Sequence, residues 1–406
     1  MTPQLLRTHP APEHEILDFP LPPPGTMGPP EEYVWLREDC PVARVRMPLG
    51  ATAWYVTRYD DVRELMADPR LVRPTINEWP ERPGEPADHG PALTTMAELD
   101  GPRHTALRRA VAPAFSARAI RKRLPRIREL AEQLLEPFHE SGSPGDLVAG
   151  FTEPFPLLAM CDLVGIPYEE RNAFLPVLDE ALSGMVTAKE GRRLTDALRE
   201  YVAALIGHKR HRPGDDVLTR LVRQCEHGGL TDEDVTAFAL SMLTAGFGTS
   251  GIFLANSVLT LLSQPRLYDR LRDDRQIMPA AVEELLRYTP VGNGMVILLA
   301  VEDIELNGQT IRKGEAVLPV LASANRDESV FTDADRLDLC RVADNHLAFG
   351  RGIHNCIGSH LARAELAVGL QALLDRFPRL RPAEGREPAW DDESLMKSPL
   401  SLPVSW

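Results

Sequence analysis

The chain has 406 residues, of which 43% are hydrophobic and 26% are charged, and its formal net charge is −14. These proportions are those of an ordinary soluble globular protein with a large core, and the acidic balance argues against nucleic acid as a general partner. The five cysteines are scattered without a CxxC pair, which is typical of free thiols in a reducing cytosol and excludes a zinc or disulfide framework. The N-terminus lacks a basic start followed by an apolar run, so we expect a cytoplasmic protein without signal peptide or membrane anchor.

The first predicted elements are short and mixed. A proline-rich lead-in over residues 1–30 is expected to be irregular surface chain, and residues 31–406 are expected to form one domain. Residues 43–66 predict two short strands joined near Gly50, followed by a helix opened by Asp60 or Asp61. Residues 70–97 are rich in proline, glycine and acidic residues, which indicates a long loop of the kind that is often functional.

Helices dominate the rest of the chain. The pattern is mostly helical from residue 101 to residue 287, β-branched residues and an LNGQ turn at 291–321 indicate a small sheet, and residues 390–406 indicate a last strand pair. The prediction is therefore a mainly α fold with small β-sheets at its edges.

An uncharged stretch runs from residue 235 to residue 265 and is longer than a membrane span requires. Thr231, followed by acidic residues, makes a good start for a helix. Glycines, hydroxyls and an amide interrupt its apolar surface and suit a packed or functional interior. We therefore expect a central helix buried on all sides, rather than a membrane span.

The segment HLAFGRGIHNCIGSHLARAE (residues 346–365) places Cys356 among glycines, just before a helix predicted to begin near Ser359. Glycines allow unusual backbone dihedrals and close approach to a flat object, and a helix N-terminus favours a thiolate. A thiolate in such a loop needs a cation, and haem iron can be ligated by one cysteine thiolate. The alternative is a buried structural cysteine, the commoner fate of a lone cysteine, but the dense patterning argues against it.

The sequence FGRGIHNCIG, with its continuation LARAE, resembles the haem-binding signature of the cytochromes P450, and the resemblance extends over nearly the whole chain. It implies the cytochrome P450 fold, a single domain that encloses haem b. It also implies that Cys356 is the iron ligand, that Phe349 packs against the haem near the sulfur, and that Gly350 and Gly358 shape the loop.

The segment AVEELLRYTPV contains Glu284 and Arg287, which are spaced to lie on one helix face. Such a pair is usually a surface salt bridge of little energetic value. The resemblance implies instead a buried pair that locks the haem-loop region and is joined by a later arginine. Arg336 and Arg341 both lie near the expected place, and we favour Arg341.

The segment LDGPRHTALRR resembles the family's helix over one haem edge, and its His104 and Arg108 can point at one anion. With His354, they are assigned by this resemblance to the haem propionates; without it, a solvated helix face is the better interpretation. One residue departs from the family pattern. Leu298 stands where the family usually has an arginine that reaches a propionate, which puts one propionate contact in doubt.

The uncharged helix resembles the family's central helix on the distal haem face, whose usual motif is Ala-Gly-x-acid-Thr-Thr. Here the motif is AGFGTS, so Ala245 and Thr249 match, Ser250 replaces a threonine and Gly248 replaces the acid. Thr249 is expected to hydrogen-bond a carbonyl one turn earlier. The acid normally helps to relay protons during oxygen activation, so water or a substrate group must take its place.

Two reactions are compatible with the missing acid. Water replaces the acid in a conventional hydroxylase or epoxidase of a polyketide, terpene or steroid-like metabolite, or the reaction is oxidative coupling or aromatic oxidation of a cyclic dipeptide. The second follows from a modest resemblance of TAGFGTSGIFL and IRKGEAVL to family members that oxidise cyclic dipeptides. Family geometry suggests substrate contacts from the 70–97 loop and from scattered side chains, for which core packing is the alternative; these are Leu243, Phe247, Val296, Ile297 and Met396.

The stretch from Arg103 to Arg128 holds nine basic residues and no acid, although the chain is acidic overall. A charge run on a helix is usually solvated surface. Because this one is expected near the cysteine loop, we predict that Arg108–Arg128 docks an acidic ferredoxin supplied by a ferredoxin reductase. The resemblance thus implies a haem-thiolate oxidase that uses O2 and two electrons on a small-molecule natural product. The non-enzymatic alternatives are a haem sensor and an electron carrier.

Overall fold

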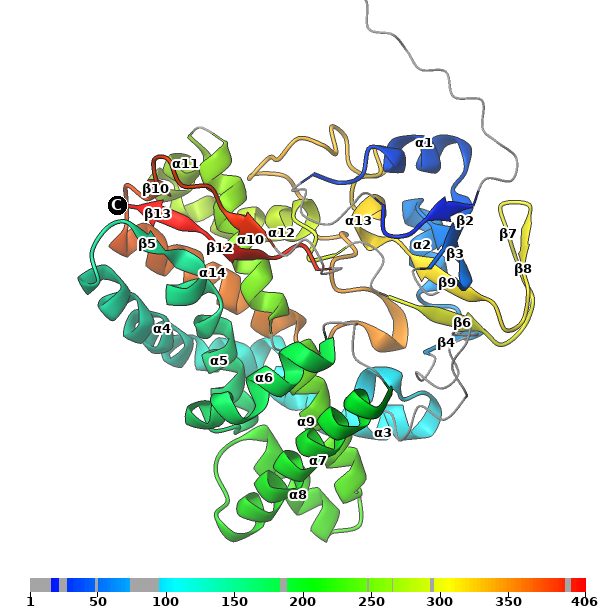
Figure 1. The fold of residues 1–406 in the computed structure, drawn as a ribbon, viewed down its shortest axis with the longest axis horizontal. Coiled ribbons are helices and arrows are strands. Elements are labelled where there is room, and N and C mark those ends of the chain that lie inside the picture. The colour runs from blue at the N-terminus through cyan, green and yellow to red at the C-terminus, as the bar shows by residue number, and fades with distance from the viewer. Residues whose placement is uncertain are drawn as a thin grey trace, which may run out of the picture.

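The computed structural model describes residues 16–21, 28–47, 50–73, 95–182, 188–246, 248–264, 266–292, 296–390 and 396–406. Most of the described chain is helical, and the largest sheet lies on the opposite side of the molecule from the main helical layer (Figure 1). The predicted class, mainly α with small β-sheets, is confirmed.

The largest sheet has six strands in the order β1-β2-β3-β9-β6-β4. Its strands are β1 (Leu17–Asp18), β2 (Val42–Arg46), β3 (Thr52–Val56), β4 (Leu71–Val72), β6 (Leu298–Ala300) and β9 (Ala316–Pro319). The smaller sheets use β5 (Gly145–Asp146), β7 (Ile304–Leu306), β8 (Gln309–Ile311), β10 (Arg381–Pro382), β11 (Ala389–Trp390), β12 (Pro399–Ser401) and β13 (Pro403–Ser405).

Alternation along the strands divides the core around the large sheet. Trp54 and Val56 of β3 face one apolar cluster, whereas Ala53 and Tyr55 face another. The second cluster includes Phe19, which is 5% exposed and follows β1 directly. The expectation of an irregular lead-in over residues 1–30 is therefore wrong for its described part at 16–21, because β1 pairs with β2 and brings Phe19 into the core.

The first helices flank the sheet and then build the helical layer. The helix predicted at Asp60 or Asp61 begins at Tyr59, whose backbone N–H binds Asp327 Oδ2 at 2.9 Å. The helices up to residue 226 are α1 (Glu32–Asp39), α2 (Tyr59–Leu65), α3 (Gly101–Phe115), α4 (Ala117–Glu140), α5 (Pro154–Val164), α6 (Arg171–Leu182), α7 (Ala188–His211) and α8 (Val217–Glu226), with short helical turns η1 (Met96–Glu98), η2 (Val148–Thr152) and η3 (Tyr168–Glu170).

The remaining helices include those that position the candidate site. They are α9 (Asp232–Ala245), α10 (Thr249–Ser263), α11 (Leu267–Asp273), α12 (Met278–Tyr288), α13 (Leu321–Ala324) and α14 (Ser359–Arg376), with short turns η4 (Arg275–Ile277) and η5 (Gly352–His354). The helix α14 packs closely along α4 and also contacts α10 and α12, so the helix that follows the cysteine loop lies at the centre of the helical layer.

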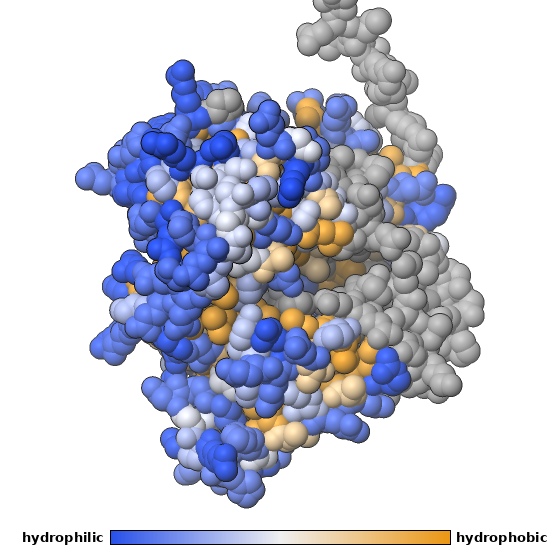
Figure 2. All heavy atoms as spheres, turned by 60° about the vertical axis from the view of Figure 1, so that its left-hand side comes forward, coloured by the Kyte–Doolittle hydropathy of each residue, from blue (hydrophilic) through white to orange (hydrophobic). Residues whose placement is uncertain are grey.

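The uncharged stretch forms two helices rather than the single one predicted. The helix α9 ends at Ala245 and α10 begins at Thr249, and between them Gly248 has φ +79°, a value that disfavours any side chain. Together they are long and apolar enough to pass for a membrane span by length and composition, but 59% of the most apolar window is buried inside the molecule. Apolar side chains also gather across the middle of one face whose surroundings are mostly hydrophilic (Figure 2).

Candidate functional site

The loop before α14 has the backbone shape that its glycines predict. Gly350 and Gly352 have φ values of +65° and +75°. A Cβ on Gly352 would lie 2.4 Å from the backbone oxygen of Met66, at the C-terminal end of α2. Gly352 is therefore required because the loop packs closely against the end of α2, whether or not a flat ligand also approaches the loop. Gly358 precedes α14 and has an ordinary φ of −79°.

Backbone hydrogen bonds fix the position of Cys356. Its N–H donates to the Phe349 carbonyl at 2.9 Å, and the Asn355 side chain donates to the Gly350 carbonyl at 3.0 Å. The surrounding protein raises the pKa of the Cys356 thiol, although the Gly358 N–H and two guanidinium groups oppose this shift. The expected lowering at a helix N-terminus is therefore outweighed in the chain alone. A metal ion bound by Cys356 would supply the missing stabilisation, because a coordinated thiol is deprotonated outright.

A network of charged side chains packs against the ring of Phe349. The guanidinium of Arg363 lies 4.6 Å from the centre of the Phe349 ring and donates two hydrogen bonds to Glu283. His346 Nε2 lies 3.1 Å from the same carboxylate. Burial alone would raise the pKa of Glu283, but its hydrogen bonds with His346 and Arg363 bring it to about 2. The carboxylate therefore stays ionised and keeps the cation over the aromatic ring.

Glu284 and Arg287 form a fully buried ion pair, with both side chains 0% exposed. Arg287 donates twice to Glu284 and also binds the backbone carbonyls of residues 325 and 334. Of the two candidate third partners, Arg341 reaches Glu284 Oε1 at 3.0 Å, whereas Arg336 contributes its carbonyl. The group ties α12 to the irregular segment that leads into the cysteine loop.

The three residues assigned to the propionates lie together around Asp100. The rings of His104 and His354 are 4.5 Å apart, and His354 Nε2 lies 2.7 Å from Asp100 Oδ1. Burial, together with nearby positive charge, lowers the pKa of His104 to about 4, and burial also lowers that of His354. Arg108 donates to the Asn355 carbonyl, next to Cys356. This cluster gathers donors at the edge of the cysteine loop.

The cluster also contains a buried donor without a partner. The Nε atom of Arg73 is shielded from solvent and makes no hydrogen bond, while the backbone N–H of Arg73 donates to Asp100 Oδ2 at 2.9 Å. Buried polar atoms are normally satisfied, so this atom indicates a ligand that accepts a hydrogen bond. A thiol in a glycine-shaped loop, with such a donor at its edge, fits haem and its carboxylates. Leu298, at the family's arginine position, is 5% exposed and packs in the apolar core.

The two distal hydroxyl groups, those of Thr249 and Ser250, lie at the start of α10, directly after the break between α9 and α10. Thr249 Oγ1 donates to the Ala245 carbonyl at 2.7 Å, which is the expected bond one turn back. Ser250 lies close to Glu365 of α14, which is 3% exposed and whose Oε1 atom has no hydrogen-bond partner within the described structure. Burial raises the pKa of Glu365 to about 8. The distal motif lacks an acid at Gly248, but a buried carboxyl group lies behind it.

The predicted substrate residues are not all in equivalent positions. Leu243 is 0% exposed inside the helical core, so the structure gives it the packing role that was the alternative. Val296 and Ile297 are half-buried just before β6, and Met396 pairs with Gly292 through an isolated β-bridge. Phe247 and residues 74–94 of the predicted loop lie outside the described residues.

Several basic residues of the predicted docking stretch are committed to internal contacts. Arg103 binds Asp234 at 2.6 Å, and Arg123 and Arg126 both bind Asp162 at 3.0 Å. Five others are exposed, and none of them takes part in the ion pairs found among the described residues; they are Arg109, Arg118, Arg121, Lys122 and Arg128. The basic surface is therefore smaller than the sequence predicts.

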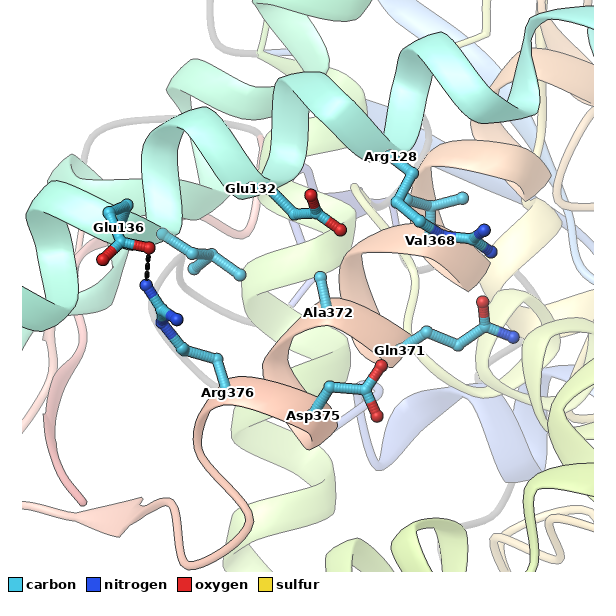
Figure 3. Close-up of a pocket in the computed structure, with 9 residues that line it drawn as sticks. Arg128, Glu132, Glu136, Val368, Gln371, Ala372, Asp375 and Arg376 are labelled. Atoms are coloured by element: carbon cyan, nitrogen blue, oxygen red, sulfur yellow. Dashed lines mark hydrogen bonds and ion pairs between the residues drawn. The ribbon is translucent and has the colours of Figure 1, made fainter.

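A groove of about 520 Å³ lies between α4 and the C-terminal part of α14 (Figure 3). Both signs of charge line it, and Arg376 pairs with Glu136 across it. Its α14 residues begin at Val368, nine residues beyond the start of α14. Since a helix rises about 1.5 Å per residue, this groove is well separated from Cys356 along α14 and does not belong to the cysteine site.

Sequence reasoning missed Arg73, Asp100, Glu283, Arg363 and Glu365. Glu365 and Arg363 were visible in the LARAE continuation and Glu283 in the AVEELLR segment, but their roles depend on contacts between helices far apart in the chain. Arg73 carried no local signal, because only strand pairing places it beside the cluster.

Comparisons with known proteins agree with this geometry. The cytochrome P450 family model matches residues 173–404. The chain is 40% identical to nocardicin C N-oxygenase of Nocardia uniformis subsp. tsuyamanensis, over 92% of this chain and 94% of that protein. It is 38% identical to mycinamicin IV hydroxylase/epoxidase of Micromonospora griseorubida, again over 92% and 94%. The crystal structure of the LnmA cytochrome P450 hydroxylase of Streptomyces atroolivaceus superposes with a TM-score of 0.84 at 37% identity, covering 96% of this chain and 100% of that one. The chain belongs to the cytochrome P450 family and is a bacterial haem b oxidoreductase of the monooxygenase class.

Proposed function

We propose that this cytochrome P450 oxidises a cyclic dipeptide by oxidative coupling or aromatic oxidation, with O2 and two electrons from a ferredoxin system. The coarser function, oxidation of a natural product, is that of relatives whose names include nocardicin and mycinamicin. The observation that carries the finer proposal is the distal break, where Gly248, with φ +79°, replaces the usual acid beside Thr249. A substrate whose own N–H or O–H hydrogen is removed reduces the need for a carboxylate at that place.

The residues of the chain divide the work between two sides. On the proximal side, Cys356 is the group that would hold the iron, with Phe349 beside it and His104, Arg108 and His354 at the edge. The bound haem supplies the oxidising power that it draws from O2 and two electrons. On the distal side, Thr249 bonds back to Ala245 and exposes the helix break, and Ser250 holds a contact to Glu365 through which a proton can be exchanged.

The substrate would lie over the break and against the segment just before β6. Val296, Ile297 and Met396 are half-buried there, and with Phe247 they remain our proposed contacts. Leu243 is left out of this set, because it has no exposed surface to offer a ligand.

Titration with cyclic dipeptides tests the proposal directly. We expect tryptophan- or tyrosine-containing cyclic dipeptides to shift the iron from low to high spin, and we expect turnover to give a coupled or ring-oxidised product. A macrolide such as mycinamicin IV is the matched comparison, since a relative bears its name. A spin shift with the macrolide alone, followed by insertion of one oxygen atom, would replace the proposal with its second candidate.

The second candidate is conventional hydroxylation or epoxidation, which the name of the Micromonospora relative favours. In that case water must take the place of the acid at Gly248. The haem-sensor and electron-carrier alternatives fall away, because the chain belongs to an enzyme family with named monooxygenase relatives.

We propose that an acidic ferredoxin docks on the exposed basic residues of α3 and α4. Arg118, Arg121 and Lys122 lie on one helix face at spacings of three and four, and α3 reaches the cysteine loop through Arg108. Arg123 is excluded from this surface because it pairs with Asp162 at 3.0 Å.

Charge reversal tests this docking surface. Arg118→Glu, Arg121→Glu and Lys122→Glu together should slow ferredoxin-supported turnover at least about tenfold at low salt, and the defect should shrink as salt rises. Turnover driven by peroxide should change little. The matched control reverses Arg381, an exposed arginine of β10. Equal losses in both assays would indicate misfolding or haem loss and would contradict a docking role.

A further inference from the structure

Arg73 directly follows β4, the strand that pairs with β6, and Leu298 is the first residue of β6. The antiparallel register of β4 and β6 joins Leu71 to Ala300 and Val72 to Leu299. We infer that one further step of the same register, beyond the end of β4 at Val72, sets Arg73 opposite Leu298. Directly opposed residues of an antiparallel pair point to the same face, with Cβ atoms about 4.5–5.5 Å apart. The two side chains therefore leave the sheet side by side.

We propose that Arg73 binds the haem propionate that the usual arginine at the Leu298 position would bind. In this chain the guanidinium comes from Arg73, directly after β4, instead of from position 298 of β6, and it binds the same propionate. This inference concerns cofactor binding and does not depend on which natural product the enzyme oxidises.

The surroundings of Arg73 support a carboxylate ligand. Its Nε atom is buried and makes no hydrogen bond, and leaving such a donor unmet costs free energy. Burial lowers the pKa of Arg73, which only Asp100 opposes among the causes of this shift. An anion beside this guanidinium would remove the penalty, and planar guanidinium groups suit carboxylates best.

The charges of the cluster also leave room for an anion. Burial, together with nearby positive charge, lowers the pKa of His104 to about 4, so this histidine favours the neutral form near pH 7. Arg108 donates to the Asn355 carbonyl, and Asp100 is divided between the Arg73 backbone and His354. Arg73 is thus the cation of this cluster that has an unused buried donor.

The position of Leu298 explains why the exchange can be tolerated. Leu298 is 5% exposed and packs with Leu71 and Ala300 in the apolar cluster beneath the sheet. A leucine at this place strengthens that cluster through apolar burial. Carboxylate recognition passes to the neighbouring strand, so the enzyme keeps a propionate contact despite departing from the family pattern.

Haem release measures the proposed contact without relying on catalysis. Transfer of haem from the holoenzyme to excess apomyoglobin should be about tenfold to a hundredfold faster in Arg73→Leu, since a hydrogen bond to a charged group contributes about 1.5–3 kcal/mol. Arg70→Leu is the matched control, because Arg70 lies three residues away and pairs with Asp68 on the exposed side. Its haem release should equal that of the wild type.

A charge swap separates propionate binding from general packing. The double variant Arg73→Leu with Leu298→Arg returns the guanidinium to the other strand, and its haem release should come back to within about threefold of wild type, as expected for two sites that serve one contact. Arg73→Gln serves if leucine at 73 prevents folding, and it should also release haem faster. Release from Arg73→Leu or Arg73→Gln at the wild-type rate would overturn the proposal. So would a double variant that loses haem as fast as the single one.

Discussion

The proximal and distal sides of the site differ in the residues that form them: the proximal side is held by hydrogen bonds and buried charges, whereas the distal side is mostly apolar. On the proximal side, the Cys356 loop is held by backbone hydrogen bonds, by Arg363 over Phe349 and by the buried pair behind it. On the distal side, two apolar helices meet at a glycine break, beside which lie the hydroxyl groups of Thr249 and Ser250. The difference follows from what each side must do: the proximal side fixes one ligand atom, whereas the distal side must admit substrate and oxygen.

The largest expected effect comes from removing the proximal ligand. Cys356→Ser should abolish the thiolate-type band of the reduced CO complex, because a serine hydroxyl does not supply thiolate donation to the iron. Cys340→Ser is the control, since Cys340 is an exposed cysteine that pairs with Arg270. If Cys356→Ser kept the band, the proximal assignment would be wrong.

The buried pair behind the proximal loop should show the next largest effect. Glu284→Gln leaves Arg287 buried without its counter-charge, which should lower the free energy of unfolding by about 3–5 kcal/mol. Urea unfolding of the holoenzyme measures this loss.

Asp303→Asn provides the comparison for that measurement, because Asp303 pairs with Arg312 at the surface. That change should have little effect on the free energy of unfolding, because solvent screens an exposed ion pair. Equal effects of the two substitutions would mean that the proximal side owes little to its buried charges.

Changing the distal glycine sharpens the other half of the comparison. Gly248→Asp restores the usual acid but strains a backbone with φ +79°, at a cost of about 1–3 kcal/mol. Gly248→Asn has nearly the same shape and strain without the charge, so it isolates the effect of the carboxylate. If the reaction needs no acid here, Gly248→Asp should form no more native product per electron than Gly248→Asn.

Product profile and hydrogen peroxide release, measured together, decide this case. An unchanged product with tighter coupling in Gly248→Asp than in Gly248→Asn would contradict the coupling proposal. It would identify a conventional hydroxylase whose proton relay lacks its acid.

The last effect, which depends on pH, is expected at Glu365, where the distal side touches α14. Its pKa of about 8 in the folded protein exceeds the ordinary value of 4.5. Between these values the folded state holds a proton that the unfolded state has lost, so this group makes stability fall as pH rises from 4.5 to 8. Glu365→Gln should flatten that fall, as urea unfolding at several pH values would show.

Glu384→Gln, which makes the same substitution at an exposed position, is the matched control for these unfolding measurements. A wild-type and a Glu365→Gln profile of the same slope would show that Glu365 is ionised in the folded protein. Glu365 would then hold no proton that could be exchanged through Ser250.

Short-range patterns made several features of both sides predictable. The glycines around Cys356, the spacing of Glu284 and Arg287, and the capping of α9 by Thr231 are all set within a few residues, where backbone sterics and helix geometry act. The choice of Arg341 over Arg336 was favoured from the family pattern, and the structure shows its contact with Glu284.

Other features depended on which distant segments meet. The exposed part of the basic stretch became visible only when Asp162 and Asp234 were found to bind Arg123, Arg126 and Arg103. The strand β1 depends on two distant contacts: it pairs with β2, and Phe19 directly after it is buried in an apolar cluster.

What the sequence by itself determined is the identity of the ligand-bearing loop and the absence of two expected charges, at Gly248 and Leu298. Only the tertiary structure decided which charged or ionisable side chains lie near these two positions. The pairing of β4 with β6 leads the chain to Arg73 near the start of β6, and the packing of α10 on α14 brings Glu365 to Ser250. The physical reason is that a charge acts through space: a guanidinium or a carboxyl group can serve a site from any strand or helix that folds beside it, at a distance along the chain that no local pattern records.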